Sequence, residues 1–276
     1  MLKFGDTYLN FGGTYLSGWK AVPNYNPLNL PPNTVRVRTN DGNTPVKSNN
    51  TSYETATLVS GTTDVYDVYK SGTDFSDLLY DSTNVVEVLG ANTTGITHMI
   101  GMFVGCSSLT TVQPFDTSNV VLMYSMFGDC TSLTSVPLFD TSITISMYFM
   151  FARCASLTSV PLLDTSSVSN MQSMFLECTS LTSVPLFDTS SVTNMNYMLY
   201  NCSSLTTVPL FNTSNVDRMD GMLSDCINVQ SGALALYNQV STQPTPPEGH
   251  NKVFYNCGIN TETGSAELAQ IPDDWK

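Results

Sequence analysis

The chain has 276 residues, enough for one large domain or two modest ones with a buried core. Acidic residues outnumber basic ones 23 to 10, which gives a formal net charge of −13. Because nucleic-acid affinity depends on Lys and Arg neutralising phosphates, this charge excludes a nucleic-acid partner, and it also disfavours an anionic membrane surface.

We expect no targeting signal at either end of the sequence. The N-terminal residues have no apolar run of signal-peptide length, and no segment has the ~18–20 apolar residues of a membrane span. We therefore expect a chain without a membrane span that is made in a cytoplasm and not exported by an obvious route. The seven cysteines cannot all pair within one chain, which fits a reducing environment.

Residues 1–33 form the first predicted segment, and they are rich in aromatic residues and glycine. The sequence Phe-Gly-Asp-Thr-Tyr-Leu is followed closely by Phe-Gly-Gly-Thr-Tyr-Leu. An exposed aromatic patch usually marks an interaction, so we predict an attachment segment that contacts other proteins or further copies of the chain. The predicted attachment residues are Phe4, Tyr8, Phe11, Tyr15 and Trp19.

Residues 34–79 alternate like β-strands and are predicted to form a small β subdomain. Val35 and Val37 would share one buried face, and further strands are expected at residues 57–59 and 65–69. We expect this subdomain to cover the first unit of the region that follows it.

A 24-residue repeat occupies residues 80–231. One cysteine recurs at this interval, and columns of Met, Leu and Val recur in register with it. A fixed period of this size predicts a solenoid, in which each coil buries its apolar face against its neighbours. The cysteine column, which we expect to pack in the core, is Cys106, Cys130, Cys154, Cys178, Cys202 and Cys226.

Each repeat contains two different patterns. Apolar residues from Val120 to Cys130 follow a helical spacing, which predicts a short helix or helical turn. Residues 109–112 are predicted to form a short strand. In the later repeats a proline follows the equivalent segment and ends the strand. One short parallel strand and one short helix per coil give an α/β solenoid. Residues 232–276 are predicted to form a C-terminal helical cap, with helices near residues 232–237 and 265–270.

The repeat resembles the BspA-like leucine-rich repeats of bacterial surface proteins. The residues that carry the resemblance are Phe-Asp-Thr-Ser-x-Val-x-x-Met-x-x-Met-Phe-x-x-Cys-x-Ser-Leu-Thr-Ser. Repeats of that family are usually slightly longer, so this chain would be a 24-residue variant. The resemblance implies a right-handed leucine-rich-repeat array used for adhesion or protein recognition, and it implies no catalytic residues.

The flanking segments 29–36 and 265–272 resemble those of repeat proteins from gut bacteria and their phages. This resemblance leads to our first hypothesis, a phage virion component: a fibre, tail or decoration protein that is made in the host cytoplasm and released by lysis. The alternatives are a BspA-like adhesin on a bacterial cell surface and a structural decoration protein with no ligand.

A column of hydroxyl residues follows the predicted strands, where a partner could reach it. The default interpretation is a solvated strand face, and the alternative, which makes these residues our binding candidates, is a surface for a host surface protein or a glycan. The predicted binding residues are Thr111, Ser135, Ser159, Ser183 and Thr207.

A column of aspartates precedes the predicted helices, and it favours turn formation and helix capping over an ion site. It comprises Asp116, Asp140, Asp164 and Asp188. The two histidines, His98 and His250, lie far apart in the sequence, and we find no catalytic or phosphate-binding motif near either. We therefore expect no enzyme activity, no cofactor and no metal.

Overall fold

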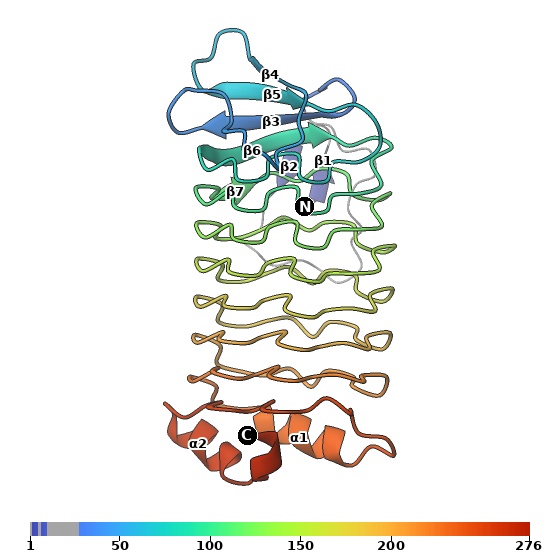
Figure 1. Ribbon diagram of the computed structural model, residues 1–276, viewed down its shortest axis with the longest axis vertical. Helices are drawn as coiled ribbons and strands as arrows, with labels where there is room; N and C mark the ends of the chain where they lie inside the picture. Colours follow the sequence, from blue (N-terminus) through green and yellow to red (C-terminus); the bar gives the residue numbers. More distant parts are fainter. Residues whose placement is uncertain (1, 5–6, 10–27) are drawn as a thin grey trace.

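The computed structural model describes residues 2–4, 7–9 and 28–276. Figure 1 shows a stack of coils along the long axis, with strands at one end and helices at the other. Strand β1 (Leu2–Phe4) pairs antiparallel with β2 (Thr7–Leu9). Of the predicted attachment residues, Phe4 and Tyr8 lie on these two strands. The others, Phe11, Tyr15 and Trp19, lie outside the described residues.

A five-stranded sheet with the order β4-β5-β3-β6-β7 forms the end of the stack that is nearer the N-terminus. Its strands are β3 (Thr34–Thr39), β4 (Thr55–Leu58), β5 (Val65–Tyr69), β6 (Val85–Asn92) and β7 (Thr111–Val112). Val35 and Val37 are fully buried on β3, as the alternating pattern predicts. The strand expected at residues 65–69 is confirmed, and β4 begins two residues before the expected 57–59.

Strand β6 joins this sheet to the stack of coils. It pairs antiparallel with β3 and parallel with β7, so the sheet is mixed. The sheet therefore contains residues from both sides of the boundary predicted between residues 79 and 80.

Successive coils are held in a 24-residue register. Parallel bridges join Leu122 to His98 and to Ser146, and the same bridges continue through the later coils. Backbone hydrogen bonds also cross between coils, for example from Ser125 N to Tyr148 O at 2.8 Å and from Phe127 N to Met150 O at 2.9 Å. Equivalent positions of neighbouring repeats therefore lie above one another, as the sequence period predicts (Figure 1).

The predicted helix in each coil is wrong for the described coils, which contain a series of turns instead. Ser125 and Asp129 have φ angles of 58° and 61°, in the left-handed region that an α-helix cannot contain. The N–H groups of Ser125, Phe127 and Asp129 donate to the next coil rather than to residues within their own coil. The helical spacing of apolar residues therefore reports which side chains point inward, and it does not report the backbone conformation.

The predicted strand in each coil is also mostly wrong, because only Thr111–Val112 forms a strand among the predicted strand segments of the coils. In the coils that carry the proline, the equivalent backbone bonds are longer than the 2.9 Å from Thr110 N to Val86 O, and the longest is 3.5 Å from Thr134 N to Thr110 O. The proline that follows each later segment cannot donate to a ladder, which limits the pairing.

The core is one continuous apolar cluster that runs through the coils. Phenylalanine rings stack from coil to coil, with centroids 5.8 Å apart for Phe127 and Phe151 and 5.6 Å for Phe151 and Phe175. All seven cysteines are free and buried, which confirms the predicted packing role of the cysteine column. The Cys130 thiol donates to the Phe103 carbonyl at 3.1 Å, so the sulfur is also hydrogen-bonded to the preceding coil.

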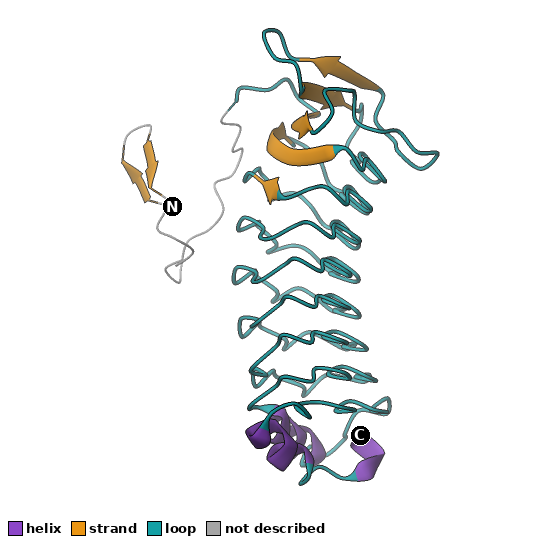
Figure 2. Ribbon diagram, turned by 90° about the vertical axis from the view of Figure 1, so that its left-hand side faces the viewer, coloured by secondary structure: helices purple, strands orange, loops and turns teal. Residues whose placement is uncertain are grey.

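The other end of the stack is closed by short helices (Figure 2). They are α1 (Ala233–Ser241), α2 (Glu262–Leu268) and the 3₁₀ helix η1 (Asp273–Trp275). The helices predicted near residues 232–237 and 265–270 are therefore confirmed. None of the helices in the described residues is long and apolar enough to cross a membrane.

Candidate functional site

The predicted hydroxyl column lies on one exposed side of the coils. Each of its members is exposed and stands directly before a buried valine, such as Val160 after Ser159. In an extended segment, neighbouring side chains point to opposite faces, so burial of the valine directs the hydroxyl outward. The hydroxyls of Ser135, Ser159 and Ser183 form no hydrogen bond with any described residue, which leaves them available to a ligand.

The neighbouring threonine column has a different role. Thr134 Oγ1 donates to Thr110 O at 3.4 Å, and Thr158 Oγ1 donates to Thr134 O at 3.4 Å. The same bond recurs at Thr182 and Thr206. These threonine hydroxyls therefore join neighbouring coils.

A column of exposed leucines lies three residues beyond the hydroxyl column. Leu162, Leu186 and Leu210 are 55 %, 61 % and 52 % exposed, and Leu138 is half-buried. These leucines were not among the binding residues predicted from the sequence. The sequence feature that indicates their exposure is the pair of apolar residues after each proline. Phe187 fills the core, so the preceding Leu186 must face outward.

The leucine column and every member of the hydroxyl column except Thr111 lie on four short equivalent segments. We call these segments the repeat face: residues 134–138, 158–162, 182–186 and 206–210. Three have the sequence Thr-Ser-Val-Pro-Leu and the fourth has Thr-Thr-Val-Pro-Leu, so none contains a charge. The face is therefore a regular uncharged surface within a strongly acidic protein.

The aspartate column forms turns, as predicted. Asp140 Oδ1 accepts hydrogen bonds from Ser142 N at 3.1 Å and from Ser142 Oγ at 2.7 Å. The equivalent bonds from Ser190 lower the pKa of Asp188. The predicted helix capping is wrong because no helix follows these turns. Across residues 2–4, 7–9 and 28–276, no group of three or more His, Cys, Asp and Glu side chains could hold a metal.

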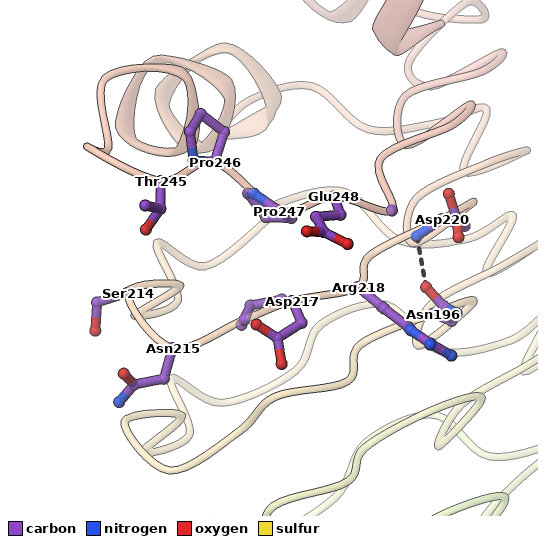
Figure 3. A pocket seen from close by; sticks show the side chains of 12 residues that line it. Asn196, Ser214, Asn215, Asp217, Arg218, Asp220, Thr245, Pro246, Pro247 and Glu248 are labelled. Carbon is purple, nitrogen blue, oxygen red and sulfur yellow. Dashed lines mark hydrogen bonds between the residues drawn. The ribbon is translucent and has the colours of Figure 1, made fainter.

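An open polar groove of about 1010 Å³ lies between the last coils and residues 245–249, in the loop that follows α1 (Figure 3). Asp217, Asp220 and Glu248 bring carboxylates to it, and Arg218 brings a guanidinium group. Asn196 Oδ1 accepts a hydrogen bond from Asp220 N at 2.7 Å across neighbouring coils.

Neither histidine lines this groove, so neither can act as a base in it. His250 stacks on Trp275 with ring centroids 4.4 Å apart, and its Nδ1 contacts the Pro247 carbonyl. His98 belongs to an early coil, where its Nδ1 lies 2.9 Å from Thr97 Oγ1.

Two overlapping matches to one protein family cover residues 73–183 and 137–238, which together make up more than half of the chain. The family is described as "Mycoplasma protein of unknown function, DUF285". The chain belongs to the DUF285 family. The matched residues of this DUF285 protein include the whole repeat face.

A similar solved structure is a leucine-rich repeat protein from Eubacterium ventriosum ATCC 27560. It is 21 % identical to this DUF285 chain, with a TM-score of 0.40. The similarity covers 56 % of this chain and 43 % of that protein, so the chain matches less than half of that protein's length. No curated protein sequence matches the chain.

Proposed function

We propose that the chain is a non-enzymatic binding protein and that its repeat face recognises a protein on a cell surface. The observation that carries this proposal is the exposed column of Leu162, Leu186 and Leu210 beside hydroxyls that form no hydrogen bond with the described residues. Contiguous exposed apolar side chains on a soluble protein usually mark an interaction site.

The chemistry of the repeat face favours a protein partner. Leucine side chains gain free energy when a partner removes them from water, and an apolar protein surface does this well. The adjacent hydroxyls can donate to or accept from a partner's backbone groups. The absence of charge on the face means that association costs no desolvation of charged groups there.

For the biological context, we propose a phage virion component: a fibre, tail or decoration protein. The resemblance of the flanking segments to phage repeat proteins supports this context, and a BspA-like adhesin on a bacterial surface is equally consistent with the fold. Residues 1–33 would then attach the chain to other virion proteins or to further copies of itself. Mass spectrometry of purified virions, compared with bacterial surface fractions, distinguishes the two contexts.

Replacing Leu162, Leu186 and Leu210 together by aspartate tests the repeat face. We expect at least a tenfold loss in binding of the fluorescently labelled protein to bacterial cells, measured by flow cytometry over a panel of gut strains. Binding should weaken because the three introduced carboxylates would have to be buried in the interface without a partner of opposite charge. Because the leucines are exposed, the melting temperature should change little.

The matched control is Leu58→Asp, which introduces the same charge at an exposed leucine on β4. It should bind cells like the unmodified chain. Treating the cells with a protease should abolish binding if the partner is a protein. Cell binding that the triple substitution leaves unchanged, or that protease treatment leaves unchanged, would contradict the proposal, and so would the absence of binding to every strain.

A further inference from the structure

A second, smaller pocket of about 410 Å³ lies beside the last coils, where the segment 251–255 packs against them. Three tyrosines line it: Tyr197 and Tyr200 from a coil, and Tyr255 from the C-terminal segment. Tyr197 and Tyr255 are each 43 % exposed, so their rings remain accessible. The Tyr197 and Tyr200 rings meet edge to face, with centroids 5.9 Å apart.

The position of the Tyr197 ring depends on a glycine in the next coil. A Cβ atom on Gly221 would lie 2.6 Å from Cδ1 and Cε1 of this ring. Gly221 therefore provides the space in which the ring lies.

The coil geometry itself does not require a tyrosine at this position. Tyr197 has a φ angle of 55°, and Ser125 and Ser173 adopt the same conformation at equivalent positions, with φ angles of 58° and 55°. Because serine is sufficient for the turn, the aromatic ring is a local addition to the repeat.

Polar groups surround the three rings. Asp220 Oδ1 accepts hydrogen bonds from Asn251 N at 2.8 Å and from Asn251 Nδ2 at 3.0 Å, which fix this carboxylate. Asp225 Oδ1 accepts from Asn256 Nδ2 at 2.8 Å. Lys252 Nζ lies 5.3 Å from the centroid of the Tyr255 ring and adds a donor. The pocket thus combines aromatic faces with both acceptors and a donor.

We propose that this pocket binds a neutral saccharide. A sugar ring has apolar C–H faces that pack against aromatic rings, and hydroxyl groups that donate to carboxylates and accept from an ammonium group. A cationic ligand would be repelled by the ammonium group of Lys252. An anionic ligand would meet Asp220 and Asp225 in a chain of net charge −13. This pocket is separate from the repeat face and goes beyond the function proposed for it.

Binding of the full chain to a printed array of neutral, anionic and amino-sugar glycans tests the proposal. We expect binding to at least one neutral glycan, and at least a tenfold loss of affinity for that glycan in Tyr197→Ser and in Tyr255→Ala. Tyr197→Ser should keep the coil folded, since serine occupies this position in two other coils. The matched control is Tyr69→Ala, which removes a tyrosine 37 % exposed on β5 and should bind as the unmodified chain does.

The proposal is overturned if no neutral glycan binds, if only charged glycans bind, or if both tyrosine variants keep full affinity. The triple leucine variant should retain glycan binding, so failure of the saccharide site and failure of the repeat face give different results.

Discussion

We expect Met174→Asp to lower the free energy of unfolding by at least about 3 kcal/mol. Met174 is fully buried in the continuous core, and its backbone carbonyl accepts a hydrogen bond from Phe151 N at 2.9 Å. Substitution removes the packing of the thioether and places a carboxylate in an apolar layer between two coils. Urea denaturation followed by circular dichroism measures the change.

Leu186→Asp is the matched control, because it introduces the same charge in the following coil at a side chain that is 61 % exposed. Its free energy of unfolding should change by no more than about 0.5 kcal/mol. If Met174→Asp had an equally small effect, the methionine column would face solvent, and the assignment of inner and outer columns would be wrong.

Gly232→Ala should destabilise the junction between the last coil and the C-terminal cap. Gly232 has a φ angle of 100°, and an added Cβ atom would lie 2.2 Å from the Val208 carbonyl oxygen. The substitution combines an unfavourable backbone conformation with a clash against backbone, so we expect a loss of about 2–4 kcal/mol in the free energy of unfolding. Hydrogen exchange should also become faster in α1, which begins at the next residue.

Gly61→Ala separates the two causes. Gly61 also has a positive φ angle, 81°, but an added Cβ atom would meet nothing within 4 Å. This control should cost only the conformational strain, about 1–2 kcal/mol. Equal losses in the two variants would mean that the Val208 carbonyl does not limit the space at Gly232.

The sequence predicts the register and the core well because both follow directly from the 24-residue period. Cys130 and Met174 recur in columns that face inward in every coil. The backbone conformation could not be predicted in the same way. A helix and a series of turns bury the same pattern of side chains, and the choice depends on the left-handed conformation at two positions per coil. Residues as different as Ser125 and Phe149 occupy the first of these positions.

The candidate sites were predicted only in part, for a related reason. Ser159 belongs to the exposed column that the alternating pattern indicates, but Leu162 reads as a core residue until Leu163 is seen to fill the core. The tyrosine pocket combines Tyr197 with Tyr255, which approach one another only because the C-terminal segment packs against the last coils. Local sequence patterns carry no information on that contact.

The 24-residue register directs the same columns of side chains into the core of every coil. Counting reactive thiols tests it most directly, because six cysteines occupy one such column and Cys257 is buried in the cap. Burial raises the pKa of both Cys178 and Cys257 to about 12, so these thiols stay protonated and unreactive at pH 8. Mass spectrometry after brief alkylation should find almost no label on the native chain and seven labels on the denatured chain. Rapid labelling of the six column cysteines in the native chain would contradict the register and, with it, the repeat face.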